Sequence, residues 1–130
     1  MKKDVATRED LYNLLEVFYT RAFADDLIGR FFTEVVPLDL ETHLPVITNF
    51  WEAIVFNTQG YRKNVMEVHQ HIHHLSNIKK EHLQRWVALF TTNVDEHFEG
   101  PKATLMKQRA QSIATLMDIK LNHNPINKLP

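Results

Sequence analysis

The chain has 130 residues, 44% hydrophobic and 24% charged, and its 15 basic and 16 acidic residues give a formal net charge of −1. This length fits one domain, and the composition is that of a globular protein, not a disordered one. The near-neutral charge, without any long run of like charge, argues against nucleic acid or anionic lipid as a partner. The sequence has no cysteine, which excludes disulfides, zinc–thiolate sites, iron–sulfur clusters and thiol nucleophiles.

No apolar segment is long enough to span a membrane, and the first ten residues lack the apolar region of a signal peptide. We therefore expect a cytoplasmic protein without a membrane anchor. The predicted organisation is a single domain over residues 1–123, followed by a polar tail over residues 124–130 that contains two prolines.

Apolar residues recur with helical spacing in every long segment, and strand-like alternation is absent. The first helix is expected after Thr7, because Thr7 and Asp10 have the spacing of a capping box. Its predicted buried face consists of Leu11, Leu14, Leu15, Phe18, Tyr19 and Ala22. A brief helical piece over residues 27–36 is expected next, and Pro37 closes it.

A helix over about residues 41–57 is expected to be capped by Asp39, and Pro45 places its regular part near His43, since proline is tolerated only in a first turn. Its predicted buried face is His43, Ile47, Phe50, Trp51 and Ile54. A short helix over residues 64–74 follows.

Two more long helices complete the predicted all-α domain. The first runs from about Lys80 to Phe98, with an inner face of Leu83, Trp86, Val87, Phe90 and Val94. The last begins at Pro101 after Gly100, with an apolar face of Leu105, Met106, Ala110, Ile113, Leu116 and Met117.

The stretch VHQHIHHL contains four histidines, His69, His71, His73 and His74. Since helical residues step by about 100°, His69 lies on the apolar side, His71 faces water, and His73 lies near the side of His69. Three interpretations are open. His69 and His73 could chelate a divalent metal together with carboxylates or another helix, His69 alone could be the axial ligand of a porphyrin iron, or all four could cover a helix surface.

Three polar side chains are predicted to face inward from other helices: Tyr19, His43 and Trp86. Each could be an ordinary buried residue with a local hydrogen-bond partner. Together with an axial imidazole, they would form the polar wall of a haem pocket, which handles a bound ligand.

The segments LLEVFYTRAFADD, ETHLPVITNFW, NVMEVH, EHLQRWVALF and QRAQSIATLM, in this order, resemble the truncated haemoglobins and specifically their group III branch. The resemblance covers about Asp10 to Lys120. It implies a two-over-two helical sandwich that encloses a haem, with haem b as the expected cofactor.

The resemblance places the proximal iron ligand on His69 and the distal pocket on Tyr19, His43 and Trp86. Phe32 falls on the aromatic position that packs against the haem, and further haem contacts are expected from Phe50, Met66, Ile72 and Phe90. A change of helix phase after His69 would place His73 or His71 on the iron instead.

The implied function is reversible binding of O₂ or another diatomic ligand, held tightly by hydrogen bonds from Tyr19 and Trp86. A swing of His43 onto the iron would instead give a six-coordinate resting state. The alternatives are a haem enzyme with peroxidase-like or nitric oxide- and nitrite-processing activity, and a non-haem helical protein that binds metal through its histidine cluster.

The expected partners are O₂, NO or peroxide and a reductase for the iron, and the expected assembly is a monomer or weak dimer.

Overall fold

The computed structural model describes residues 2–32, 39–57 and 78–119, and all regular structure within these ranges is helical. The long helices are α1 (Arg8–Ala24), α2 (Leu40–Val55), α4 (Lys80–His97) and α5 (Pro101–Asp118). The predicted all-α class is therefore confirmed. The short helix predicted over residues 64–74 and the predicted tail over 124–130 lie outside the described residues.

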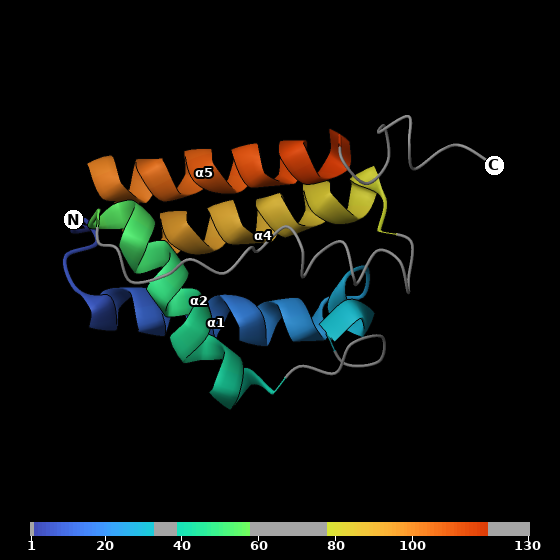
Figure 1. Ribbon diagram of the computed structural model, residues 1–130, viewed down its shortest axis with the longest axis horizontal. Coiled ribbons are helices and arrows are strands. Elements are labelled where there is room, and N and C mark those ends of the chain that lie inside the picture. The colour runs from blue at the N-terminus through green and yellow to red at the C-terminus, as the bar shows by residue number, and fades with distance from the viewer. Residues whose placement is uncertain (1, 33–38, 58–77, 120–130) are drawn as a thin grey trace.

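The four helices form two pairs. Figure 1 shows α4 and α5 running side by side in opposite directions, while α2 crosses α1 on the other side of the molecule. Helix α1 packs against both α2 and α4, so the core lies between the pairs. This is the two-over-two sandwich that the sequence predicts.

Helix α1 begins as its sequence predicts. The hydroxyl of Thr7 accepts a hydrogen bond from the backbone N–H of Asp10 (3.1 Å), and the carboxylate of Asp10 accepts one from the N–H of Thr7 (3.1 Å). The capping box satisfies backbone donors that a helix start otherwise leaves unpaired. The predicted inner face is confirmed, because all six of its residues are buried.

Helix α2 starts earlier than predicted. It begins at Leu40, and the carboxylate of Asp39 caps it by accepting from the N–H of Glu41 (3.2 Å). The expected start near His43 is wrong, and Pro45 lies inside the helix, in its second turn. Proline has no N–H to give the carbonyl of Glu41, so the Asp39 cap stabilises a first turn that is short of one backbone hydrogen bond.

The buried faces of the later helices differ in part from those predicted. In α2, Ile47 and Trp51 are buried as predicted, while His43, Phe50 and Ile54 are only half-buried. The buried face is completed by residues outside the predicted stripe: Leu44, Thr48 and Val55.

In α4, Leu83, Phe90 and Val94 are buried, and Trp86 and Val87 are half-buried. In α5 the predicted burial of Leu116 is wrong, because this side chain is 46% exposed. Met106, Ala110 and Met117 are buried as predicted, and the small residues Ala103 and Ala114, which were not predicted, are buried as well and let α5 lie close to its neighbours.

The start of α5 is capped from the other end of the sequence. The carboxylate of Asp4 accepts hydrogen bonds from the backbone N–H groups of Lys102 (3.0 Å) and Ala103 (2.9 Å). Burial raises the pKa of Asp4, but these backbone hydrogen bonds outweigh it and hold the pKa below its ordinary value. Gly100 is required beside them, because its φ is +147° and a Cβ there would lie 2.5 Å from Cγ of Asp4.

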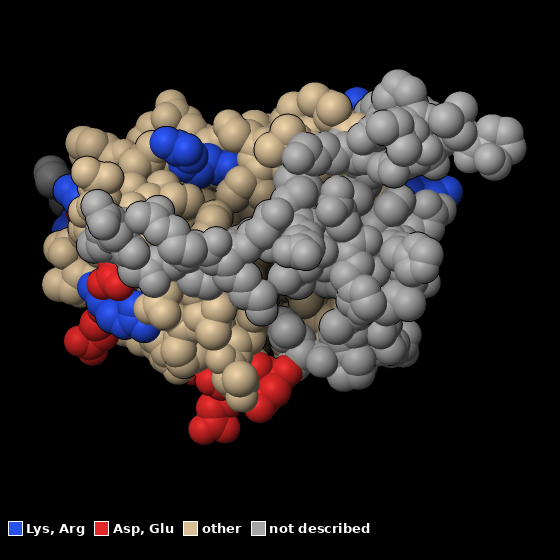
Figure 2. Space-filling view, viewed as in Figure 1, with Lys and Arg blue, Asp and Glu red and all other residues tan. Residues whose placement is uncertain are grey.

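None of the described helices is long and apolar enough to cross a membrane. Figure 2 shows charged side chains scattered over the described part of one face, with basic and acidic groups together near the start of α1. Two ion pairs are formed there, between Arg8 and Glu52 (3.0 Å) and between Lys3 and Asp10 (3.4 Å).

Candidate functional site: an aromatic pocket around Tyr19 and Trp86

Three of the predicted pocket residues meet at the ring of Tyr19. Tyr19 lies on the inner face of α1, Phe32 follows the turn after α1, and His43 lies in the first turns of α2. The Tyr19 ring meets the His43 ring edge-on at a centroid distance of 5.2 Å and the Phe32 ring at 6.0 Å. The fold thus brings together side chains from three separate segments.

Trp86 belongs to a second group of rings on α4. It stacks on Phe90 at 5.8 Å and meets Phe18 edge-on at 6.2 Å. Phe18 in turn meets Tyr19 at 5.0 Å, and Phe90 stacks on Trp51 at 5.0 Å. Trp86 is therefore connected to Tyr19 through Phe18 without touching it ring to ring.

Two small hollows lie beside Trp86, which lines both of them. One, of about 50 Å³, has Phe31, Phe32 and Leu83 in its wall. The other, of about 20 Å³, has Tyr19, Phe50 and Phe90 in its wall. The described residues that line them include no carboxylate, lysine or arginine, so both walls are apolar and aromatic.

The buried hydroxyl of Tyr19 has no hydrogen-bond partner among the described residues. The side chain is only 7% exposed, and within residues 2–32, 39–57 and 78–119 its hydroxyl makes no hydrogen bond. Burial raises the pKa of this hydroxyl, which therefore stays protonated and can only be a donor or neutral acceptor. The indole N–H of Trp86 also lacks a hydrogen bond to the described part of the chain.

His82 lies in this region, although it is not among the site residues predicted from the sequence. Its Nδ1 accepts a hydrogen bond from the backbone N–H of Lys79 (2.8 Å), so the ring proton lies on Nε2. Burial among apolar neighbours lowers the pKa of His82, and its ring meets Phe31 edge-on at 4.9 Å. The signal was available, because His82 lies four residues before Trp86 on the same side of a predicted helix.

The described residues fit a haem pocket by their chemistry. A porphyrin requires broad apolar walls, and a ligand at its iron requires protonated donors that are not already paired. Both occur here. The predicted iron ligand His69 and the predicted haem contacts Met66 and Ile72 lie outside the described residues, as do His71, His73 and His74. Among the residues that the structure does describe, no three potential metal ligands come together.

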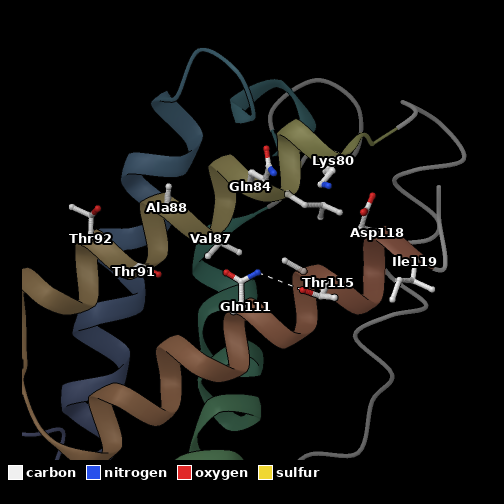
Figure 3. Close-up of a pocket in the computed structure, with 12 residues that line it drawn as sticks. Lys80, Gln84, Val87, Ala88, Thr91, Thr92, Gln111, Thr115, Asp118 and Ile119 are labelled. Carbon is white, nitrogen blue, oxygen red and sulfur yellow. Dashed lines mark hydrogen bonds between the residues drawn. The ribbon is translucent and has the colours of Figure 1, made fainter. Parts of the chain in front are cut away.

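A larger groove of about 550 Å³ lies between α4 and α5 (Figure 3). Its wall mixes apolar residues such as Val87 with the polar residues Gln84, Gln111 and Thr115, and Gln111 donates to Thr115 across 3.4 Å. None of the predicted site residues lines this groove.

The chain is similar to known proteins in both sequence and fold. No protein-family model matches the chain. Over 118 residues it is 25% identical to a group 3 truncated haemoglobin of Campylobacter jejuni, covering 88% of this chain and 91% of that protein. The crystal structure of a group III truncated haemoglobin from Campylobacter jejuni has a TM-score of 0.79 at 23% identity, covering 95% of this chain and 98% of the other. The chain therefore has the truncated-globin fold, and its predicted resemblance to the group III truncated haemoglobins is confirmed over nearly its whole length.

Proposed function

We propose that the chain is a haem-binding globin that reversibly binds O₂ or another diatomic ligand in the pocket around Tyr19 and Trp86. The observation that carries the proposal is the buried hydroxyl of Tyr19, which has no hydrogen bond within the described residues. Native proteins rarely leave such a group unpaired, because an unsatisfied buried donor costs about 1–3 kcal/mol. A ligand bound in the pocket would supply such a partner, and the truncated-globin fold supports a haem-bound ligand in that role.

The cofactor we propose is haem b, held without covalent attachment, since the chain has no cysteine to form a thioether. The iron would supply the position at which the diatomic ligand binds. We propose His69 as its axial ligand from helical phase and from the family resemblance. The apolar contacts would come from Phe32, Phe50 and Phe90, together with Met66 and Ile72.

The chain's own part is to present protonated donors in a pocket that is poor in water. Tyr19 would donate to the bound ligand through its hydroxyl, and Trp86 through its indole N–H. Hydrogen bonds to a group that gains charge contribute about 1.5–3 kcal/mol when water is excluded. Since about 1.4 kcal/mol corresponds to a factor of ten, either donor would slow ligand release by at least about tenfold. His43 lies edge-on to the Tyr19 ring and is the third polar side chain of the pocket.

A haem titration tests the cofactor. The purified chain should develop a Soret band with one equivalent of haem, and His69→Ala should lose the band or shift it while His73→Ala keeps it. The reverse result for the two variants would move the ligand to His73. Absence of a Soret band in the unaltered chain would exclude the globin function and leave the histidine cluster as a non-haem metal site.

The rate of O₂ release tests the role of Tyr19. Tyr19→Phe should release O₂ at least about tenfold faster, because the variant loses only the hydroxyl donor. Tyr12→Phe is the matched control, since Tyr12 is a half-buried tyrosine of the same helix that lines neither hollow. An unchanged release rate in Tyr19→Phe would exclude Tyr19 as the main donor. If peroxide or nitrite turnover fell in its place, the haem-enzyme alternative would be favoured.

The reductase, the cytoplasmic location and the monomer or weak dimer stay predictions from the sequence.

A further inference from the structure

An ion pair joins the end of α1 to α4 beside the pocket. Arg85 donates to Oδ1 of Asp25 through Nε (2.8 Å) and lies within 2.7 Å of the same oxygen through Nη2. The Asp25 side chain is only 6% exposed, whereas that of Arg85 is 47% exposed. The hydrogen bond from Arg85 and those from the backbone hold the pKa of Asp25 below its ordinary value, against the effect of burial.

The second oxygen of Asp25 organises the turn that follows α1. Oδ2 accepts hydrogen bonds from the backbone N–H groups of Leu27 (3.0 Å) and Ile28 (3.1 Å). The N–H of Gly29 donates to the carbonyl of Asp25 (2.9 Å), and a Cβ at Gly29 would lie 2.4 Å from the carbonyl oxygen of Phe23. These contacts hold the turn against the last turn of α1.

The two partners of the ion pair do not line the 50 Å³ hollow themselves, but each adjoins a segment that forms one of its walls. The turn that Asp25 organises leads into Phe31 and Phe32 on one wall, and Arg85 directly precedes Trp86 on the other. Phe32 is wedged between two rings of α1, since it stacks on Phe23 at 5.4 Å and meets Tyr19 edge-on at 6.0 Å. Two contacts among the described residues join these walls: the ion pair between Asp25 and Arg85, and the edge-on contact of Phe31 with His82 at 4.9 Å.

Trp86 packs against the core but is only half-buried, so its exposure to water depends on the wall beside it. Its ring contacts among the described residues are those with Phe18 and Phe90, and its N–H makes no hydrogen bond to the described chain. We propose that Asp25 and Arg85 are positioning residues: their ion pair sets the width of the hollow and holds the indole N–H of Trp86 at its place relative to the Tyr19 hydroxyl. The effect on a bound ligand rests on the proposed function, whereas the effect on Trp86 does not.

The first test uses the chain without haem and reads the surroundings of Trp86 directly. The chain has two tryptophans, so Trp51→Phe leaves Trp86 as the only tryptophan, and excitation at the red edge of the band avoids the tyrosines. In this background, Arg85→Gln should move the emission to longer wavelength and increase quenching by acrylamide, because the wall that carries Trp86 opens to water. Arg85→Lys should recover part of the change, since it restores the charge but not the two-point contact.

Arg21→Gln is the matched control. Arg21 also joins α1 to α4, through an ion pair with Glu96 and a hydrogen bond to Asn93 (3.2 Å), and its side chain is 44% exposed, close to the value for Arg85. Neither Arg21 nor its partners lines either hollow. The control should leave the emission of Trp86 unchanged. Equal shifts in the two variants, or none in either, would overturn the proposal.

The second test uses the haem-loaded chain and asks whether Arg85 acts through Trp86. Arg85→Gln should speed O₂ release by up to about tenfold, and it should add nothing further in a Trp86→Phe background. An equal acceleration in both backgrounds would show a general loosening of the fold and would overturn the positioning role. A missing Soret band would instead contradict the proposed function, and the fluorescence comparison would still decide the role of the ion pair.

Discussion

Asn93 and Tyr19 are both buried where α1 faces the rest of the core, and they differ in how their polar atoms are used. Asn93 is fully buried, its amide nitrogen donates to the carbonyl of Leu14 (3.0 Å), and its oxygen accepts from Arg21 (3.2 Å). The hydroxyl of Tyr19 is paired with nothing that the structure describes. The polar groups of Asn93 hold α1 to α4, whereas the hydroxyl of Tyr19 is the donor that our proposal assigns to a ligand.

The largest expected effect comes from removing the hydrogen bonds of Asn93. Asn93→Leu removes the hydrogen bonds that the amide makes with the carbonyl of Leu14 and with Arg21, which should lower the free energy of unfolding by about 1–3 kcal/mol. Urea denaturation measures the change. Asn13→Leu, at an exposed position of α1, should alter it by no more than about 0.5 kcal/mol. Comparable losses in both variants would mean that the hydrogen bonds of Asn93 are not what matters.

The next largest effect is expected from acid, because it protonates carboxylates that accept hydrogen bonds in the folded protein. The pKa values of Asp4, Asp10 and Asp25 lie below the ordinary aspartate value of 3.8, so each contributes stability that is complete above that value and is lost as the pH falls through its folded pKa. Thermal unfolding measured from pH 6 down to pH 2 should show this loss. Asp4→Asn should flatten the acid branch, because one of the three groups no longer titrates. An identical acid branch would contradict the assigned cap of α5.

A smaller effect separates a buried from an exposed hydroxyl that makes the same hydrogen bond. Thr48 is fully buried in α2 and donates to the carbonyl of Leu44 (2.6 Å). Thr48→Val should therefore cost about 1 kcal/mol of unfolding free energy. Thr20 makes the same contact with the carbonyl of Glu16 (2.8 Å) at an exposed position, where water can replace it. Thr20→Val should cost clearly less, and equal costs would remove burial as the cause.

The smallest effect is expected at Tyr19 itself. In the haem-free chain, Tyr19→Phe removes a hydroxyl that has no hydrogen bond within the described residues, so the free energy of unfolding should stay within about 0.5 kcal/mol or rise. Denaturation of the two haem-free proteins side by side measures it. A loss of more than about 1 kcal/mol would mean that the hydroxyl is already paired, which would remove the main support for the proposed function.

Local signals predicted the fold well where the structure depends on neighbours in sequence. The capping box and the apolar spacing of α1 are complete within residues 7–22, so its start and its whole buried face could be read from the sequence. The start of α2 could not, because the rule that excludes proline from helix interiors competes with the cap that Asp39 provides, and the cap prevailed. The exposure of Leu116 depends on which neighbours α5 packs against, which no local pattern reveals.

The same limit applies to the candidate site. The helical stripes and the family resemblance singled out Tyr19, His43 and Phe32, whose rings the fold brings together. The contact between Asp25 and Arg85 joins residues 60 positions apart, and nothing in either local sequence distinguishes it from an ordinary surface charge. Residue type and periodicity can thus single out side chains that the fold brings together, whereas a contact between charged side chains far apart in the sequence requires the three-dimensional structure.

The cap of α5 has a consequence for the order in which the chain can fold. Asp4 lies 98 residues before Lys102, and the carbonyl of Lys3 also accepts from the N–H of Glu99 (3.0 Å), so the loop between α4 and α5 closes onto the beginning of the sequence. During synthesis this carboxylate leaves the ribosome long before the helix that it caps. Its hydrogen bonds to the backbone of α5 cannot form until α5 has been made. The first turn of α5 is therefore completed late, by a residue made 98 positions before the helix that it caps.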